Sequence, residues 1–153
     1  MTEVALIAKD GPSWRDAMAY ARQCPWRAGP YLAKEMEKGG WLAWERVIVA
    51  REAGCIVGFC SFRAQDELPE IWGFSPFIGF VYVEEGQRGR RISQRMIDAV
   101  MRHAAACGFE RVYLMSSERG LYEKYGFEKI GDYETVWGTV DQLFARPCEK
   151  QRI

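Results

Sequence analysis

Hydrophobic and polar residues follow two rhythms along the chain, and these predict both strands and helices. Alternating or continuously apolar runs are typical of strands, whereas a repeat of about 3.6 residues is typical of an amphipathic helix. The predicted order of elements is β-α-α-β-β-β-α-β-α-β-β. The predicted strands cover residues 4–8, 46–51, 55–62, Phe77–Val83 and 112–115, with two more from Phe127 onward.

The helices are predicted from apolar stripes and from residues that start or end a helix. Ser13 is a favourable N-cap for the first helix. The third helix has an apolar stripe that repeats from Ile92 at helical spacing, and Gly108 is well placed to end it. The predicted helices cover Trp14–Gln23, 31–38, a segment from Ile92 to the stop at 107–108, and 118–125.

Together these elements predict an α/β fold with one central mixed β-sheet flanked by helices. The strand Phe77–Val83, the helix from Ile92 and the strand 112–115 should form a right-handed crossover between parallel strands. The short turn at 52–54 suits an antiparallel hairpin. Since the chain has no internal repeat, low-complexity tract or linker, residues 1–153 are expected to form a single domain.

Composition and charge exclude several classes of protein. Hydrophobic residues make up 48% of the chain and charged residues 27%, which argues against disorder. The 21 basic and 21 acidic side chains cancel, so we expect neither nucleic acid nor a membrane as partner. No segment approaches the roughly 20 apolar residues that span a bilayer, and the N-terminal residues lack the pattern of a signal peptide.

The five cysteines indicate a reducing compartment. Their number is odd, and they show no Cys-x-x-Cys or Cys/His spacing of the kind that binds a metal. Cys55, Cys60 and Cys107 lie in apolar stretches and are expected to be small buried residues. The expected location is therefore the cytoplasm, and no metal site is expected.

The densest chemistry lies where the strand Phe77–Val83 runs through a basic loop into the helix from Ile92. The first N–H groups of a helix have no partner within it and carry the positive end of the helix dipole, so a diphosphate is a natural ligand. Gly89 lets the backbone approach phosphates, and the neighbouring arginines add charge-assisted hydrogen bonds. The alternative is a solvated basic turn in which the glycine only eases the bend.

This loop resembles the acetyl-coenzyme A signature of the GNAT acetyltransferase superfamily, written Q/R-x-x-G-x-G/A. Arg88 takes the first position, and Gly89 and Arg90 fill the variable ones. Arg91 stands where the first glycine is expected, and Ser93 stands where the final glycine or alanine is expected. These two departures predict that the loop lies differently, or that the side chain at position 91 points away from the diphosphate or alongside it.

A second stretch supports the resemblance. Residues 120–127 are similar to the L-Y-x-K-x-G-F box near the C-terminus of the same superfamily, and the spacing of one helix and one strand between the motifs also fits. The resemblance implies the GNAT acyl-CoA N-acyltransferase fold, with the pantetheine arm in a gap beside the splayed strand Phe77–Val83. The implied coenzyme A-binding residues are Val81, Tyr82, Val83, Arg88, Gly89, Arg90, Arg91, Ile92, Ser93, Gln94 and Ser116.

The resemblance also implies the reaction. An amine attacks the thioester of acetyl-CoA directly through a tetrahedral intermediate, and Tyr122 matches the tyrosine that protonates the leaving thiolate in many members. Its alternative role is packing, with the hydroxyl at the surface. Ser116 either contacts coenzyme A or, like Ser117, caps the next helix.

The general base is left open by the sequence, since the strand Phe77–Val83 contains no acid. The sole histidine, His103, is expected to be a structural or exposed helical residue. The acids that flank the strand and could act through water are Asp66, Glu67, Glu70, Glu84 and Glu85.

Aromatic residues predict the acceptor. They could pack an apolar or cationic small molecule, the latter through cation–π contacts, so the expected acceptor is a small-molecule primary amine. The aromatic residues concerned are Trp14, Trp26, Tyr31, Trp41, Trp44, Trp72, Phe74, Tyr133 and Trp137. The alternatives are a protein N-terminus or lysine as acceptor, a non-catalytic coenzyme A-binding module, or a nucleic-acid binder using the clustered arginines. Either a monomer or a homodimer is expected.

Overall fold

The structure is a computed structural model that describes residues 1–149 of the 153. Its elements follow the predicted order, with two short 3₁₀ turns added. The strands are β1 (Thr2–Ile7), β2 (Arg46–Glu52), β3 (Cys55–Arg63), β4 (Phe77–Val83), β5 (Arg111–Ser116), β6 (Glu128–Glu134) and β7 (Val140–Pro147). The helices are α1 (Trp14–Gln23), α2 (Ala28–Lys38), α3 (Ile92–Ala106) and α4 (Leu121–Lys124), with 3₁₀ turns η1 (Glu70–Trp72) and η2 (Glu85–Gln87).

The strands form a mixed sheet in the hydrogen-bonded order β1-β2-β3-β4-β5-β7-β6. Strands β4 and β5 pair in parallel and are connected through α3. The pairs β1–β2, β2–β3, β5–β7 and β6–β7 are antiparallel. The predicted mixed sheet, its parallel pair and its antiparallel hairpins are therefore confirmed.

The chain divides into two compact units, each built from two stretches of sequence. The N-terminal unit contains Met1–Phe62 and Phe80–Val100. The C-terminal unit contains Arg63–Gly79 and the residues from Met101 onward. Strand β4 and helix α3 each begin in one unit and end in the other.

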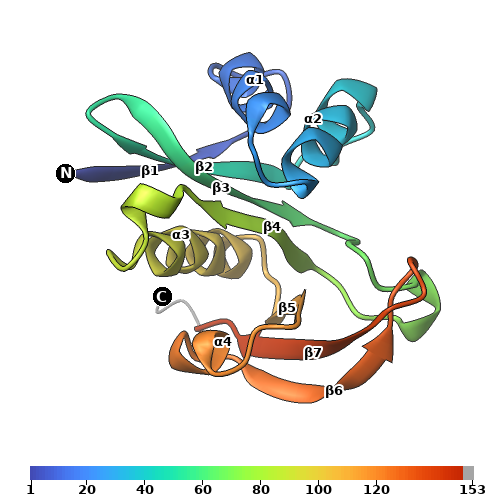
Figure 1. Ribbon diagram of the computed structural model, residues 1–153. Helices are drawn as coiled ribbons and strands as arrows, with labels where there is room; N and C mark the ends of the chain where they lie inside the picture. The colour runs from blue at the N-terminus through green and yellow to red at the C-terminus, as the bar shows by residue number, and fades with distance from the viewer. Residues whose placement is uncertain (150–153) are drawn as a thin grey trace. The chain divides into compact units, whose positions relative to one another are not determined.

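In the N-terminal unit, helices α1 and α2 pack side by side and cover the antiparallel strands β1, β2 and β3 (Figure 1). Within this core the rings of Trp14 and Trp41 meet edge to face, with centroids 5.1 Å apart. The β2–β3 hairpin turns at Ala53 and Gly54, whose φ angles are 49° and 82°. Two successive positive φ angles match the twist of a hairpin, which explains why so short a turn suffices.

The predicted side-chain cap of α1 is wrong. The helix begins at Trp14 as predicted, but Ser13 has a φ of 73° and its side chain makes no capping hydrogen bond. An N-cap side chain reaches the first turn from an extended backbone, and this left-handed backbone does not aim the hydroxyl there. Helix α2 also starts at Ala28, three residues before the predicted start, because its first turn accommodates Pro30.

In the C-terminal unit, β5, β7 and β6 form an antiparallel sheet, and the first residues of β4 pair with β5. The parallel register joins Phe77 to Tyr113 and Ile78 to Leu114. A small hydrophobic core of this unit contains Leu68, Phe77, Met115 and Leu143, with Phe74, Tyr113 and Tyr133 packed against it. The loop before β4 is thus anchored by its own apolar side chains.

Helix α4 is shorter than predicted, because it begins at Leu121 rather than at residue 118. The preceding turn is held instead by a side chain of β7. The amide of Gln142 donates to the carbonyl oxygens of Ser116 at 3.2 Å and Glu118 at 2.9 Å. Gly120, with a φ of 85°, then leads into the helix.

The predicted burial of the cysteines is right for Cys60 and wrong for two others. Cys60 is fully buried in β3, whereas Cys55 and Cys107 are exposed at the ends of their elements. Apolar neighbours in sequence did not predict exposure here, because turns bring both residues to the surface. All five cysteines are free.

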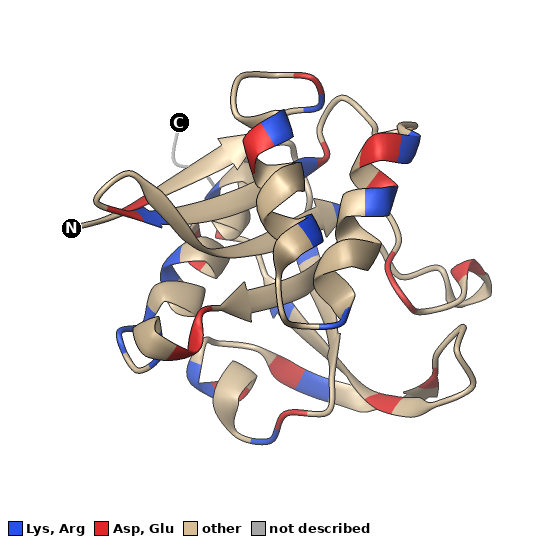
Figure 2. Cartoon of the chain, turned by 45° about the horizontal axis from the view of Figure 1, so that its top comes forward, with Lys and Arg blue, Asp and Glu red and all other residues tan. Residues whose placement is uncertain are grey.

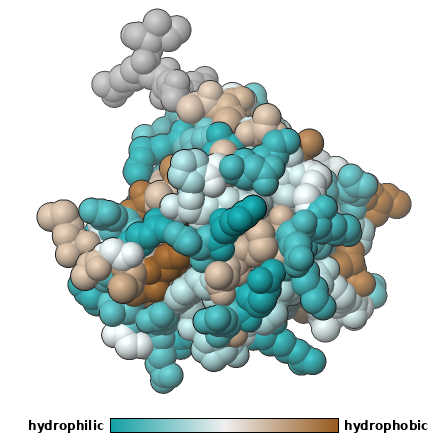
Figure 3. Space-filling model, turned by 90° about the horizontal axis from the view of Figure 1, so that it is seen from above, coloured by the Kyte–Doolittle hydropathy of each residue, from teal (hydrophilic) through white to brown (hydrophobic). Residues whose placement is uncertain are grey.

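Charged residues are interspersed on the surface helices. Helices α1 and α2 both contain basic and acidic residues, which are blue and red in Figure 2. The face that these helices form is mostly hydrophilic, with small and separate apolar areas (Figure 3). Among residues 1–149, no helix has the length and apolarity required to cross a membrane.

Candidate functional site

The candidate site begins in the N-terminal unit, where β4 leads through a tight loop into α3. The backbone N–H of Glu84 donates to the carbonyl of Val57 at 2.8 Å, which fixes the end of the strand. The turn η2 follows, and the chain then passes through Gly89 with a φ of 84° and Arg91 with a φ of 60°. Two left-handed residues so close together turn the backbone sharply before the helix starts.

Arg91 accepts the first helical hydrogen bond of α3, since its carbonyl lies 3.1 Å from the N–H of Arg95. A non-glycine residue in the left-handed region is strained by roughly 1–2 kcal/mol. The strained position is the one at which the signature has its first glycine. Arg91 replaces the glycine of the signature, but its backbone keeps the left-handed conformation that glycine favours. The Arg91 side chain is exposed.

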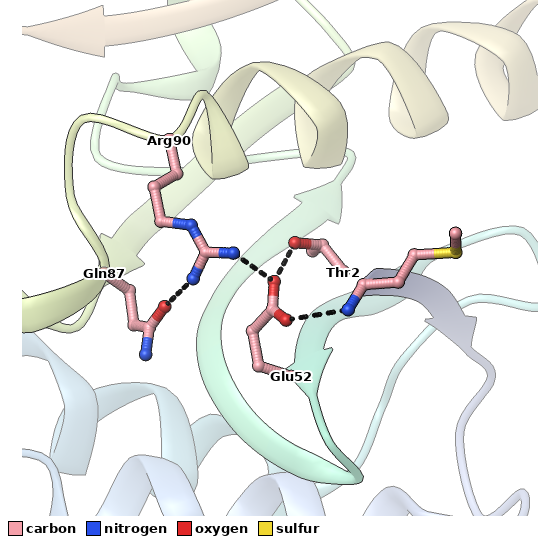
Figure 4. Close-up of polar contacts among 5 residues, drawn as sticks. Thr2, Glu52, Gln87 and Arg90 are labelled. Atoms are coloured by element: carbon pink, nitrogen blue, oxygen red, sulfur yellow. Dashed lines mark hydrogen bonds and ion pairs between the residues drawn. The ribbon is translucent and has the colours of Figure 1, made fainter.

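Two arginines of the loop are held by the protein's own acceptors. The Nε of Arg88 donates to the carbonyl of Val83 at 3.0 Å. Arg90 donates from Nη1 to Oε1 of Gln87 at 2.5 Å, and its Nη2 lies 3.5 Å from Oε1 of Glu52 in the hairpin (Figure 4). These contacts set the position of the loop, and each guanidinium carries further N–H donors for an anion.

Glu52 is the centre of this small network. Its carboxylate accepts a hydrogen bond from the hydroxyl of Thr2 and lies 3.4 Å from the amino group of Met1 (Figure 4). The pKa of Glu52 is lowered, first by the Thr2 hydrogen bond and then by the Met1 amino group and Arg90. The loop is thereby tied to β1 and β2 through one ionised side chain.

The first turn of α3 contains Ile92, Ser93 and Gln94. Ile92 is buried and anchors the start of the helix, while Ser93 and Gln94 are partly exposed. The backbone N–H groups of a first turn have no carbonyl partner within their own helix. This end of the helix is therefore the part of the loop best suited to an anion.

The end of β4 supplies the neighbouring backbone. Tyr82 points into the core, where its ring stacks on Trp26 with centroids 5.7 Å apart. Val81 and Val83, which alternate with it along the strand, are only half-buried. Gly58 of β3 permits close contact with β4, because a Cβ there would lie 2.7 Å from the carbonyl oxygen of Tyr82.

Phe80 interrupts the regular conformation of β4. Its φ is 52°, which is unusual for a bulky residue. Its ring stacks on Tyr31 of α2, with centroids 6.0 Å apart and an angle of 21° between the planes. The strand thus changes backbone direction just before Val81.

In the C-terminal unit, Tyr122 lies on α4 with its side chain 6% exposed. Its ring packs near Phe144, Tyr125 and Phe127, with centroid distances of 5.9, 6.1 and 6.2 Å. Ser116 ends β5, and its hydroxyl oxygen accepts the N–H of Glu118 at 3.0 Å. The serine therefore stabilises the turn before α4 and does not cap the helix itself.

The acids left open as candidate bases differ strongly in environment. Burial raises the pKa of Asp66 to about 6 and that of Glu67 to about 7, with the carboxyls of Asp66 and Asp141 adding to the shift at Glu67. In the N-terminal unit, Glu84 accepts a hydrogen bond from the hydroxyl of Tyr20 at 2.7 Å. Glu70 and Glu85 are exposed in 3₁₀ turns.

Sequence reasoning missed a contact between Asp66 and β4. A Cβ on Gly79 would lie 2.5 Å from Oδ1 of Asp66, so the carboxyl group fills the place of the missing side chain. A glycine inside a strand often marks such a close approach, and Gly79 was the available signal. His103 lies half-buried on α3, with its Nε2 3.6 Å from Sγ of Cys107.

The predicted acceptor aromatics fall into different environments. Trp14 and Trp41 are buried in the core of their unit. Tyr31 and Trp72 are 42% and 53% exposed, and Trp72 meets Tyr133 edge to face at 5.1 Å. Within residues 1–149, no group of three or more His, Cys, Asp or Glu side chains is arranged to hold a metal ion.

Comparison with known proteins identifies the family of the chain. A sequence model of the Acetyltransferase (GNAT) family matches residues 14–127, so the chain belongs to the GNAT acetyltransferase family. The resemblance found in the sequence is thereby confirmed. No curated protein sequence matches the chain.

Solved structures share the fold over nearly the whole chain. An aminoglycoside 6'-acetyltransferase type Ii superposes with a TM-score of 0.72 at 18% identity, covering 98% of this chain and 99% of the other. An aminoglycoside 6'-N-acetyltransferase complexed with coenzyme A gives 0.68 at 15% identity, covering 99% of both chains. An acetyl-CoA-bound GNAT acetyltransferase from Elizabethkingia anophelis gives 0.64 at 14% identity, covering 95% and 97%. The predicted GNAT fold is confirmed.

Proposed function

We propose that this protein is an acetyl-CoA-dependent N-acetyltransferase that acts on the primary amine of a small molecule. The observation that carries the proposal is the loop before α3, where Gly89 and Arg91 are both left-handed and lead into the helix. In a member of the GNAT family, this backbone suits the diphosphate of coenzyme A. Membership of the family and the fold of the coenzyme A-bound structures support the choice of cosubstrate.

Coenzyme A would bind through its diphosphate and through its pantetheine arm. The N–H groups of Ile92, Ser93 and Gln94 would hold the diphosphate, because the amides of a first turn have no carbonyl partner within their own helix and lie at the positive end of its dipole. Gly89 would allow close approach, and the remaining guanidinium donors of the loop would add charge-assisted bonds. Those arginines are Arg88, Arg90 and Arg91. Backbone groups of Val81, Tyr82 and Val83 would bind the pantetheine arm, and Ser116 would add a hydroxyl contact.

The chemistry follows from the two reactants. An alkylamine has a pKa of about 10.4 and must lose a proton before it can attack the thioester carbonyl. A backbone N–H near Val81 would stabilise the oxyanion, a contact typically worth about 3–4 kcal/mol where measured in other enzymes. Tyr122 would give a proton to the departing thiolate, a role that rests on its match to the family motif.

Exposed aromatic rings and the similar proteins both support a small-molecule amine as acceptor. The partly exposed rings of Tyr31 and Trp72 suit an apolar or cationic molecule. Two similar structures are aminoglycoside acetyltransferases, whose acceptors are small molecules bearing amines. A protein N-terminus or lysine is the second candidate acceptor, and a non-catalytic coenzyme A-binding module is the third reading, favoured by the arginine at position 91.

We take residues 1–153 as one functional domain, working as a monomer or homodimer, with neither nucleic acid nor membrane as partner. The five free cysteines support a cytoplasmic location.

Thiol release tests the proposal directly. Acetyl-CoA is mixed with a panel of amines that includes aminoglycosides, simple alkylamines and peptides with free N-termini. Release that depends on one class of amine identifies the acceptor. Tyr122→Phe is expected to lower kcat about 10–100-fold while coenzyme A affinity is kept. Tyr125→Phe is the matched control, since Tyr125 directly follows α4 and its ring packs beside that of Tyr122. Tight coenzyme A binding without turnover on any amine would favour the non-catalytic module.

A further inference from the structure

A carboxylate from the preceding loop, that of Asp66, contacts strand β4 at Gly79. Gly79 has no side chain, and a Cβ built there would lie 2.5 Å from Oδ1, 2.8 Å from Cγ and 3.0 Å from Oδ2 of Asp66. Because real Cβ atoms essentially never come within 3.0 Å of another atom, any larger residue at position 79 would push the carboxylate away. The loop residue Asp66 therefore occupies the space of a strand side chain.

This carboxylate lies at the point where β4 changes its backbone. Phe77 and Ile78 pair with β5 in a regular parallel register. Gly79 follows, and Phe80 then adopts a φ of 52°. Val81, where we place the thioester carbonyl, is only two residues beyond Gly79 along the strand. Asp66 therefore contacts β4 two positions before that residue in the sequence.

The environment of Asp66 suits proton transfer. The carboxylate is half-buried, accepts a hydrogen bond from the backbone N–H of Glu67 and feels the positive charge of Arg63. The pKa of the neighbouring Glu67 is raised by burial and by the carboxyls of Asp66 and Asp141. Burial dominates and raises the pKa of Asp66 to about 6, so the group is ionised at neutral pH and more basic than an ordinary aspartate.

We infer that Asp66 is the general base that deprotonates the acceptor amine, and that Gly79 is the positioning residue that makes room for it. This inference rests on the proposed function. The acceptor ammonium passes one proton to a carboxylate oxygen of Asp66, which later releases it to solvent. The neutral nitrogen bonds to the thioester carbon, and the C–S bond breaks as the tetrahedral intermediate collapses. The attacking nitrogen loses a further proton, which is transferred to the thiolate and gives an amide and free coenzyme A.

The first test is Asp66→Asn, measured with the amine that the wild type uses best. We expect kcat/KM to fall about 100-fold. The residual activity of the variant should no longer decline below a pH of about 6. Coenzyme A affinity should stay within about two-fold, which also shows that the variant is folded. Glu70→Gln changes an exposed acid of the same loop and should leave the pH profile as it is.

The second test moves the carboxylate without removing it. Gly79→Ala places a Cβ against Asp66 and should lower kcat/KM at least 10-fold while coenzyme A still binds. In the Asp66→Asn background the same change should have little further effect, because both variants remove the same interaction. Additive losses would show that Gly79 matters for another reason and would overturn the positioning role.

The outcomes separate the inference from the proposed function. If the wild type transfers acetyl groups and Asp66→Asn keeps full activity with an unchanged pH profile, Asp66 is not the base while the enzyme assignment stands. If Glu67→Gln instead removes the acidic limb, the neighbouring carboxyl is the base and the inference is wrong. If the wild type releases no thiol with any amine, the proposed function fails, and the inference fails with it.

Discussion

Arg90 and Glu52 form an ion pair between the loop before α3 and the β2–β3 hairpin, with Nη2 of the arginine 3.5 Å from Oε1 of the glutamate. The same carboxylate is held by Thr2 and by the Met1 amino group. The guanidinium that we propose to contact the diphosphate of coenzyme A is thus paired with an acid of the protein itself. The hairpin and the phosphate would compete for one cation.

This competition predicts that Glu52→Gln changes the affinity for coenzyme A. Removing the negative charge frees Arg90 to turn toward the diphosphate, so coenzyme A should bind about three-fold more tightly at low salt. Isothermal titration measures the change. The gain should vanish in an Arg90→Ala background. An equal gain in that background would mean that Arg90 is not the group released.

Gly89 is expected to matter for its backbone conformation. Its φ is 84°, but a Cβ there would meet nothing within 4 Å. Gly89→Val should therefore weaken coenzyme A binding by straining the loop or by meeting the phosphates, and should lower stability by about 1–2 kcal/mol. Gly86→Ala is the matched control, because that glycine has open space without a positive φ. Unchanged coenzyme A affinity in the Gly89 variant would place the phosphates elsewhere.

Arg91→Gly restores the glycine of the signature at a residue with a φ of 60°. Relief of backbone strain should raise the free energy of unfolding by up to about 1 kcal/mol, since the flexibility of glycine in the unfolded chain offsets part of the gain. Thermal or urea unfolding measures this. Coenzyme A affinity is expected to change less than about five-fold. A larger loss would show that the Arg91 side chain itself binds a phosphate.

The order of elements and both family motifs were predictable because they depend on local patterns. The apolar repeat of α3 and the β-prone runs of β2–β4 are visible within a few residues of sequence. The cap at Ser13 was not predictable, since it depends on a backbone angle. The late start of α4 was equally hidden, because Gln142 holds the turn from 24 and 26 residues away in sequence.

The site was predictable only in part for the same reason. The sequence indicates the loop around Gly89 because its residues are contiguous. It offers five acids as candidate bases with nothing to choose among them. The contact between Asp66 and Gly79 depends on how the loop folds back onto β4, which no local pattern encodes.

Asp66 and Glu67 also predict how stability depends on pH. Both pKa values are raised by burial, to about 6 and about 7, so the protonated forms favour the folded state. The two carboxyl groups contribute fully to the free energy of unfolding below their ordinary pKa of about 4, and this contribution is lost as the pH rises through 6 to 7. Asp66→Asn should therefore be more stable than the wild type at pH 8, by up to about 3 kcal/mol, and no more stable at pH 4.

Unfolding at both pH values, followed by circular dichroism, measures the difference. Glu134→Gln, which changes an exposed acid of β6, is the control and should show no such trend. A lower stability of Asp66→Asn at pH 8 would mean that the ionised carboxylate stabilises the fold, in conflict with its burial.

Because the two units are interleaved in the sequence, the division affects the order in which the chain can fold during its synthesis on the ribosome. The N-terminal unit needs Phe80–Val100, so it remains incomplete until residue 100 has left the exit tunnel, and by then Arg63–Gly79 has already emerged. That early stretch must wait for the strands from β5 onward before it has its partners. A chain cut after residue 100 contains the whole N-terminal unit, but it also contains Arg63–Gly79 of the C-terminal unit, so no single cut separates the two units.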